Sequence, residues 1–345
     1  MSFPKVIFGT SGLGNLYVAM PDDVKCAIVE AYIKASNGSP FFDTAGKYGA
    51  GLALESIAKC LMQLNVAPHQ VLISNKLGWL RVPLTAKEPT FEPGVWKDLK
   101  FDAVQKISYD GILECYEQGN ELLQSYHANY VSVHDPDEYL AAATHGADEN
   151  ERYHDILQAY AALGDLKRSG KVTAIGVGAK DWTVIARIAE DVQLDWVMIA
   201  NSMTVHSHPK ALLDFMNKLK QRGTVIINSA VFNAGFLTGG EYYNYKKIEP
   251  DTPLGQQFLS WREGFYSVCA SFNISPAAVG VKFGLLAPGV KSVALSTTNP
   301  GRVAANMELV DAVIHEKLWH ELYNRQLITA DGLSMVLNGT NEIVN

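Results

Sequence analysis

The sequence predicts an α/β protein folded as a (β/α)8 barrel, also called a TIM barrel, with long loops after strands three, four and seven. Short apolar runs rich in β-branched residues recur along the 345 residues, and segments with helical periodicity separate them. The length exceeds a common domain, but barrels of about 250 residues and more fold as one unit. We therefore expect residues 1–345 to form a single barrel domain.

Eight runs are candidate strands. Each is apolar on both faces, as is typical of strands that lie buried within a parallel sheet. They cover residues 5–10, 41–44, 71–76, 130–134, 172–177, 196–201, 224–229 and 290–296.

Segments of helical period follow these strands. In residues 22–36, for example, apolar side chains recur along one stripe, and residues 51–64 repeat the pattern. Basic residues followed by glycine, as in Lys167-Arg168-Ser169-Gly170, are typical of helix ends. The remaining candidates are residues 109–126, 155–168, 182–190, 209–221, 276–286 and 300–313.

An open, doubly wound sheet is the competing architecture. It predicts a glycine-rich phosphate turn with the spacing G-x-G-x-x-G after an early strand. The one candidate, from Gly9 to Gly14, has the spacing G-x-x-G-x-G, and no acidic residue ends a strand about 20 residues later. The barrel is therefore favoured.

Three connections are too long for plain turns: residues 79–108, 135–153 and 232–255. All three leave the carboxyl ends of predicted strands, where barrel enzymes build their sites. The first contains Trp79, Arg81 and several further aromatic residues. This content favours a pocket wall over a decorative insertion.

Composition excludes several classes of function. Hydrophobic residues make up 48% and charged residues 19%, which is globular rather than disordered. The net charge of −7, without a basic block, argues against nucleic-acid or anionic-membrane partners. No apolar run is long enough to span a membrane, and the first residues do not resemble a signal peptide.

The four cysteines are widely spaced and form no CxxC pair. Cys26, Cys60, Cys115 and Cys269 are therefore expected to be small buried side chains, without a zinc site or a disulfide framework. This pattern favours a reducing, cytoplasmic location. The pair His206 and His208 has no carboxylate at ligand spacing, so we expect a loop there and no metal.

Four polar residues stand at the ends of otherwise apolar runs. Asp43 ends the second strand and Tyr48 comes just after it, while Lys76 ends the third and His134 the fourth. In a barrel, adjacent strands would bring these groups together at one mouth. Each could be structural by itself, but a buried lysine and aspartate cost several kcal/mol unless they are paired.

A buried lysine–aspartate pair beside a tyrosine has a chemical use. The cation favours tyrosinate, so it lowers the pKa of a tyrosine from its reference of about 10. Tyr48 would then donate or accept a proton near neutral pH. Asp43 would hold the ammonium group of Lys76, and His134 would hydrogen-bond a substrate oxygen.

With these residues the chain resembles the aldo-keto reductase superfamily, whose site is an Asp, Tyr, Lys, His tetrad in this order. The segments FDTAGKYG, NKLG and VHDPD carry the resemblance, which extends from Phe8 to Asn306. The chain looks most like the aldose 1-dehydrogenase branch, which includes L-fucose, L-galactose and D-threo-aldose dehydrogenases, with pyridoxal 4-dehydrogenase close by. NKLGW after strand three and FNAGFL after strand seven support that branch.

The resemblance implies a nicotinamide cofactor that lies across the barrel mouth. It places Gly9, Thr10, Asn201, Ser229, Phe232, Asn233, Gly235 and Leu237 near the nicotinamide and pyrophosphate, and Ser296, Thr297, Arg302 and Asn306 near the adenosine. Gly178-Ala179 replaces a Ser-Asn pair common in the family, and Ser296 replaces a lysine that contacts the 2′-phosphate of NADP. The choice between NAD and NADP therefore stays open.

The leading hypothesis is oxidation of an L-fucose, L-galactose or D-arabinose type of aldose at C1 to the aldonolactone, with Tyr48 as general base. Trp79 would stack under the sugar and Arg81 would contact its hydroxyls. Alternatives are an NADPH-dependent aldehyde or ketone reductase, a pyridoxal dehydrogenase and a non-catalytic regulatory subunit that binds cofactor. The expected partner is a small sugar or aldehyde; the sequence does not indicate an oligomeric state.

Overall fold

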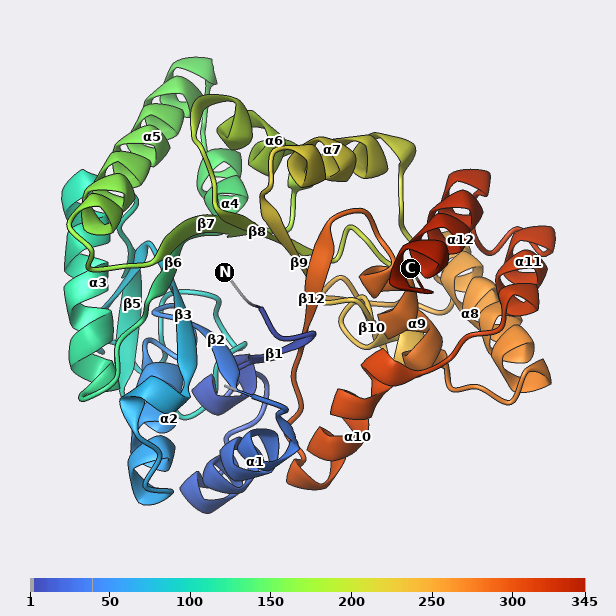
Figure 1. Cartoon of the computed structure of the whole chain (residues 1–345). Coiled ribbons are helices and arrows are strands. Elements are labelled where there is room, and N and C mark those ends of the chain that lie inside the picture. Colours follow the sequence, from blue (N-terminus) through green and yellow to red (C-terminus); the bar gives the residue numbers. More distant parts are fainter. Residues whose placement is uncertain (1–2, 39, 345) are drawn as a thin grey trace. The chain divides into compact units, whose positions relative to one another are not determined.

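The computed structural model, which describes residues 3–38 and 40–344, confirms the (β/α)8 barrel (Figure 1). Eight strands are hydrogen-bonded in the order β1-β12-β9-β8-β7-β6-β3-β2, which closes a barrel. The strands are β1 (Val6–Gly9), β2 (Phe41–Ala45), β3 (Leu72–Leu77), β6 (Tyr130–His134), β7 (Ala174–Ala179), β8 (Trp196–Ala200), β9 (Val225–Ser229) and β12 (Val290–Leu295). All eight lie within two residues of the predicted runs.

Helices alternate with these strands. Those predicted closely are α1 (Asp22–Ala35), α2 (Leu52–Gln63), α3 (Tyr109–Leu123), α6 (Trp182–Asp191), α7 (Lys210–Gln221) and α9 (Pro276–Leu285). The predicted eighth helix is broken into η4 (Pro300–Arg302), α10 (Val303–Glu308) and η5 (Leu309–Asp311). Helices α8 (Pro253–Ser271), α11 (Glu316–Asn324) and α12 (Ala330–Val344) were not predicted.

The connection after β6 is more helical than predicted. It contains α4 (Pro136–Ala141), and α5 (Gly146–Arg168) begins nine residues before the predicted start at residue 155. The first turns of α5 are polar, so no apolar period marks them. They are held by a cap instead, because the His145 side chain accepts a hydrogen bond from the Asp148 N–H.

The other two long connections contain hairpins. After β3 come β4 (Trp79–Pro83) and β5 (Phe101–Gln105), which pair antiparallel with Trp79 opposite Gln105. After β9 come η3 (Phe236–Thr238) and the short antiparallel pair β10 (Tyr242–Tyr243) and β11 (Lys246–Lys247). The remaining described elements are two short 3-10 helices, η1 (Ser11–Gly14) and η2 (Pro68–Gln70).

The chain divides into two compact units, each described by itself below. Unit 1 comprises residues 1–198 and 294–307, and unit 2 comprises residues 199–293 and 308–345. The single domain expected over residues 1–345 stays a prediction. No single helix in the described part of the chain is long and apolar enough to span a membrane, although α8 and α9, bent by 96°, pass that test as a pair.

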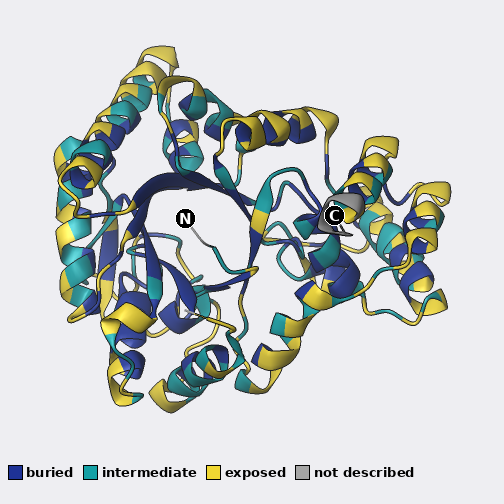
Figure 2. Ribbon diagram, viewed as in Figure 1, coloured by how far each residue is buried: buried dark blue, intermediate teal, exposed yellow. Residues whose placement is uncertain are grey.

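Within unit 1, the strands are buried on both faces, whereas the helices outside them expose their outer surfaces (Figure 2). Parallel pairing places Asp43 opposite Ser74, Ala45 opposite Lys76 and His134 opposite Gly178. This register brings the carboxyl ends of β2, β3, β6 and β7 to one edge, as the sequence argument requires.

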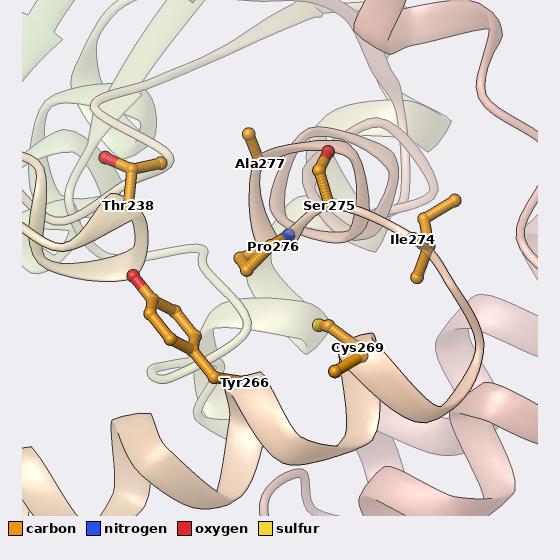
Figure 3. A pocket seen from close by; sticks show the side chains of 8 residues that line it. Thr238, Tyr266, Cys269, Ile274, Ser275, Pro276 and Ala277 are labelled. Carbon is orange, nitrogen blue, oxygen red and sulfur yellow. The ribbon is translucent and has the colours of Figure 1, made fainter.

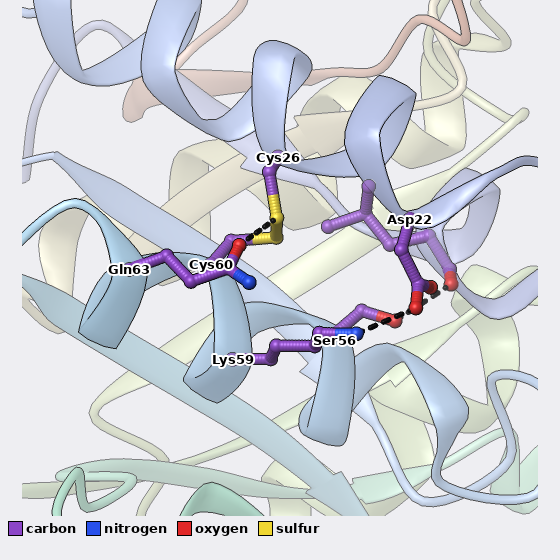
Figure 4. Close-up of a disulfide and its surroundings, with 7 residues drawn as sticks. Asp22, Cys26, Ser56, Lys59, Cys60 and Gln63 are labelled. Atoms are coloured by element: carbon purple, nitrogen blue, oxygen red, sulfur yellow. Dashed lines mark hydrogen bonds and ion pairs between the residues drawn. A yellow bond between two sulfur atoms is a disulfide. The ribbon is translucent and has the colours of Figure 1, made fainter.

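The cysteine prediction was wrong for one pair. Cys26 of α1 and Cys60 of α2 form a disulfide, with their Cα atoms 4.9 Å apart, beside Gln63 (Figure 4). The pair is 34 residues apart in the chain, so only the packing of α1 on α2 brings the two thiols together. Cys115 and Cys269 are free and buried, as expected. The cytoplasmic location stays a prediction, and its argument from unpaired cysteines no longer holds.

Candidate active site

Asp43 and Lys76 form a buried ion pair at the carboxyl ends of β2 and β3. The Lys76 Nζ lies 2.6 Å from Asp43 Oδ2, and both side chains are at most 4% exposed. Ser74 donates a hydrogen bond of 2.8 Å to the other carboxylate oxygen, Oδ1. Ser74 and Lys76 point to the same face because strand side chains alternate. The carboxylate is therefore fixed from two sides and holds the ammonium group in one place.

Tyr48 follows β2 in a tight turn. Its N–H donates to the carbonyl of Ala45, and its half-buried ring lies under the Lys76 ammonium, 4.6 Å from the ring centroid. The turn requires glycine at position 49, where φ is +62° and a Cβ would lie 2.3 Å from the Gly14 carbonyl oxygen. This close packing fixes the backbone next to Tyr48.

His134, the last residue of β6, completes the group. Its ring lies edge-on to that of Tyr48, with centroids 5.5 Å apart. Burial, and then the ammonium groups of Lys76, Lys47 and Lys180, hold the pKa of His134 well below its ordinary value. The ring is thus uncharged at neutral pH. Its buried Nδ1 has no hydrogen-bond partner among the described residues.

Gly178, read from the sequence as an altered cofactor position, has a second role. A Cβ at this position would lie 2.9 Å from Cδ of Lys76. The glycine on β7 therefore leaves the room through which the lysine side chain reaches Asp43.

A second buried charge group adjoins the tetrad and was not predicted. Lys47 Nζ lies 3.1 Å from Asp135 Oδ2, 2.8 Å from Glu138 and 2.9 Å from Glu92. Lys180 pairs with Glu138 and lies 3.6 Å from Asp135. The sequence did carry a signal, since Lys47 and Asp135 are charged residues that come just after the apolar runs of β2 and β6.

The insertion after β3 supplies an aromatic wall. Trp96 packs on Tyr48, with ring centroids 5.9 Å apart, and Phe91 lies between Trp96 and Trp79. Trp96 Nε1 donates to Glu92, which also binds Lys47. Trp96 belongs to the aromatic content from which a pocket wall was predicted, but it was not named as a site residue.

The two predicted substrate residues differ in their surroundings. Trp79 is half-buried, with Lys47 Nζ 5.1 Å from its ring centroid. The Arg81 guanidinium is already engaged by Glu55 at 2.7 Å and by the Ala50 carbonyl at 2.6 Å. These contacts hold the hairpin against α2, and a role for Arg81 in binding substrate stays a prediction.

Unit 1 contains six of the expected cofactor residues. Thr10 is buried, and its hydroxyl donates to the Asp43 carbonyl, which ties β1 to β2. Gly9 lies beside Ser296, because a Cβ placed on Gly9 would be 3.6 Å from the Cβ of Ser296. Thr297 and Asn306 are partly exposed, whereas Ser296 and Arg302 are exposed.

Unit 2 contains the other six: Asn201, Ser229, Phe232, Asn233, Gly235 and Leu237. Asn201 adopts a left-handed φ of +62°, and its N–H donates to the Ser229 carbonyl. Asn233 donates from Nδ2 to the Asn201 carbonyl, so the loops after β8 and β9 are joined. The buried Oδ1 of Asn201 has no partner among the described residues, which suits an acceptor for a carboxamide N–H.

His206 and His208 have structural contacts. His206 is enclosed by the rings of Phe236, Tyr243, Phe258 and Trp261, and its Nδ1 lies 2.9 Å from the Tyr243 hydroxyl. His208 Nε2 accepts a hydrogen bond from the Thr329 N–H. In the described part of the chain, no three His, Cys, Asp or Glu side chains are grouped to hold a metal.

A pocket of about 520 Å³ lies in unit 2, between α8, α9 and η3 (Figure 3). Its lining includes Thr238, Tyr266, Cys269 and Ser275, and none of the predicted site residues. Burial raises the pKa of the Cys269 thiol to about 12, so the thiol is unreactive at neutral pH.

Comparisons with known proteins show the family of the chain. The model of the Aldo/keto reductase family matches residues 5–324. A pyridoxal 4-dehydrogenase from Microbacterium luteolum is 24% identical over 333 residues, which cover 93% of each chain. A D-threo-aldose 1-dehydrogenase from a Pseudomonas species is 25% identical over 342 residues, or 95% of each chain.

Solved structures show the same fold. A glycerol dehydrogenase from Gluconobacter oxydans superposes with a TM-score of 0.68 at 16% identity, over 93% of this chain and 90% of that one. An aldo-keto reductase from Bacillus halodurans, in its holo form, gives a TM-score of 0.66 at 16% identity, over 94% and 92%.

Proposed function

Since the chain belongs to the aldo/keto reductase family and is an oxidoreductase that acts on a CH–OH or carbonyl group, we propose that it oxidises an aldose at C1 to the aldonolactone. The observation that carries the proposal is the packing of Tyr48 against the buried Asp43–Lys76 pair and His134. The D-threo-aldose 1-dehydrogenase relative supports the sugar as substrate class.

Tyr48 is the residue that moves the proton. Its ring lies 4.6 Å from the Lys76 ammonium, and a neighbouring cation favours the charged tyrosinate. In the oxidative direction the tyrosinate accepts the proton of the anomeric hydroxyl. In the reverse direction the same hydroxyl donates its proton to a carbonyl oxygen. Asp43 keeps the ammonium group in position in both directions.

His134 orients the substrate rather than exchanging protons with it. Because burial and three ammonium groups keep the ring uncharged, the imidazole offers a hydrogen bond to the reacting oxygen without a charge of its own. Tyr48 then remains the acid or base of the tetrad, and the two side chains hold the C1 oxygen from two directions.

A nicotinamide cofactor, NAD or NADP, supplies the hydride chemistry of this family. The residues present fit such a group: the unpartnered Oδ1 of Asn201 suits the carboxamide, and Arg302 is an exposed cation suited to a phosphate. Ser296, Thr297 and Asn306 would contact the adenosine end, and Ser229 with the loop from Phe232 to Leu237 the nicotinamide end.

The test is a panel of aldoses, including L-fucose, L-galactose and D-arabinose, assayed with NAD and with NADP by the absorbance of the reduced cofactor. We expect one aldose to give the highest kcat/KM, with lactone as the product. No oxidation of any aldose with either cofactor would overturn the proposal.

A second candidate substrate is pyridoxal, and the aromatic wall of Trp96 and Phe91 beside Tyr48 favours it. A pyridine ring would stack on that wall as a sugar face does. The pyridoxal 4-dehydrogenase relative supports this alternative. Including pyridoxal and simple aldehydes in the panel separates it, and activity on none of them would point to the non-catalytic, cofactor-binding alternative.

A further inference from the structure

A salt bridge links the two chain segments that carry Tyr48 and His134. Lys47 precedes Tyr48, Asp135 follows His134, and Lys47 Nζ lies 3.1 Å from Asp135 Oδ2. The lysine side chain is 4% exposed and the aspartate side chain 9%. The bridge therefore joins the turn after β2 to the turn after β6 in the interior of unit 1.

Three further charged side chains surround this bridge. Glu138 of α4 and Glu92 of the insertion bind Lys47, at 2.8 and 2.9 Å, and Lys180, just after β7, binds Glu138. We call Lys47, Glu92, Asp135, Glu138 and Lys180 the Lys47 cluster. Burial alone would lower the pKa of Lys47, but the carboxylates of Asp135, Glu92 and Glu138 outweigh it and raise that pKa, so the side chain stays charged.

The backbone of Asp135 is held in an unfavourable conformation. It adopts φ +47°, a left-handed conformation that non-glycine residues avoid. Its N–H donates to the Gly178 carbonyl at 2.9 Å, and its carboxylate meets two lysines. The backbone after His134 is thus fixed by several contacts at once.

We propose that the Lys47 cluster is a positioning device for the reaction, which holds the Tyr48 and His134 rings in their mutual place and ties the aromatic insertion to them. The link to the insertion runs through Glu92, which accepts from Lys47 and from Trp96 Nε1, and Trp96 packs on Tyr48. The cluster residues act through the tetrad and are positioning residues. The kinetic part of this inference rests on the proposed function.

The two lysines of the cluster also contribute to the low pKa of His134. The groups that face the ring are Tyr48, the ammonium groups of Lys76, Lys47 and Lys180, and the carboxylates of Asp135, at 3.7 Å, and Glu138. Burial lowers the pKa of His134 most, the three lysines lower it further, and Glu138 raises it. Loss of either cluster lysine therefore raises that pKa.

The experiment compares Lys47→Met and Lys180→Met with the full-length wild type, using Lys59→Met, an exposed lysine paired with Asp22 on the surface, as the matched control. The imidazole signals of histidine-labelled protein are followed by NMR from pH 8 down to the lowest pH at which the protein stays folded, and His134 is assigned by its absence in His134→Gln. We expect the His134 titration to move to higher pH in both cluster variants, because an ammonium group that disfavours the imidazolium is removed, and not in Lys59→Met.

Kinetics give the second readout. For the aldose that the wild type oxidises best, we expect kcat to fall about 10–100-fold in Lys47→Met, with KM for the cofactor changed less than about threefold, because misplaced reacting groups slow the chemical step. Lys180 is only partly buried, so Lys180→Met keeps the test available if Lys47→Met does not fold.

Two results would overturn the inference: an unchanged His134 titration in folded cluster variants, or kcat values equal to that of Lys59→Met. The NMR titration needs no substrate, so it decides on the cluster even if no aldose is oxidised. Inactivity of the wild type with a shifted titration in the variants would count against the proposed function alone.

Discussion

The side chain of Lys76 passes Gly178 on its way to Asp43, and the glycine has no side chain to obstruct it. A Cβ on Gly178 would lie 2.9 Å from Cδ of the lysine, whose end is fixed by Asp43 at 2.6 Å. Because the Lys76 side chain is held at its backbone and at its ammonium group, it cannot bend away from an added Cβ without loosening the ion pair. The glycine is therefore part of the geometry that sets the ammonium group beside Tyr48.

Gly178→Ala is expected to lower kcat about 10-fold or more, because displacement of the Lys76 ammonium weakens the proton transfer by Tyr48. Steady-state kinetics measure the effect. The matched control is Gly146→Ala, since a Cβ there meets no atom within 4 Å. Equal kcat values for the two variants would show that Lys76 adapts freely.

Substitution of Trp79 tests whether the insertion after β3 contributes to substrate selectivity. We expect Trp79→Ala to reduce kcat/KM for the preferred aldose by roughly 1–3 kcal/mol, the scale of one lost pocket contact. A small aromatic aldehyde should lose less, because it needs only the tetrad and the cofactor. If both substrates lose equally, the contacts of Trp79 with Phe91 and Lys47 are structural and the ring does not select the sugar.

Two helices of unit 1 are joined by the Cys26–Cys60 disulfide, which closes a loop with a sequence separation of 34. In the loop-closure model, a loop of this length contributes roughly 3–4 kcal/mol by restricting the unfolded chain. We expect the double variant Cys26→Ala/Cys60→Ala to lose about that much free energy of unfolding, measured by urea denaturation.

Reductant supplies the control for this prediction. It should destabilise the wild type and leave the double variant unchanged. Thiol counting on denatured, unreduced protein should find two free thiols, those of Cys115 and Cys269. Four titratable thiols would contradict the bond.

The aromatic enclosure of His206 predicts a dependence of stability on pH. Burial lowers the pKa of His206 from 6.5 to about 4, so the fold favours the uncharged ring. The unfolded chain takes up a proton below pH 6.5, while the folded chain does so only near pH 4. The stabilisation is therefore complete above pH 6.5 and is lost as the pH falls toward 4.

His206→Phe keeps a ring among Phe236, Tyr243 and Trp261 and removes the titration. The free energy of unfolding should then fall less between pH 6.5 and pH 4, by on the order of 2–3 kcal/mol. Chemical denaturation at several pH values measures this slope. The exposed His69 gives the control, His69→Gln, which should keep the wild-type slope. A wild-type slope in His206→Phe would show that the ring is not held uncharged.

At the scale of the whole molecule, the hydrophobic pattern of the sequence predicted the barrel. The strands are buried on both faces, so each appears in the sequence as a short apolar run. The same rule placed Asp43, Lys76 and His134, since charged or polar residues at the ends of such runs need a reason to be there. The structure then brought these side chains together as the strand order required.

What pattern did not predict depends on packing between distant segments. The partners of Lys47 lie 45, 88 and 91 residues away, and Cys26 meets Cys60 only across two packed helices. The start of α5 lacks a clear apolar period and was read as a loop, and most of α8 was left unassigned. The ion pair of Arg81 with Glu55 was not predicted, because the two residues lie 26 positions apart, and the role of Arg81 in binding substrate stays a prediction.

The central claim is that Tyr48 transfers the proton in an NAD(P)-dependent oxidation. The most direct measurement is the steady-state rate of Tyr48→Phe with the preferred aldose, together with cofactor binding to the same variant by fluorescence titration. The substitution removes only the hydroxyl and keeps the ring that packs on Trp96 and His134. We expect turnover to fall by about 10²–10⁴-fold or more while the Kd for cofactor stays near that of the wild type. A Tyr48→Phe rate within a few-fold of the wild-type rate would contradict the account.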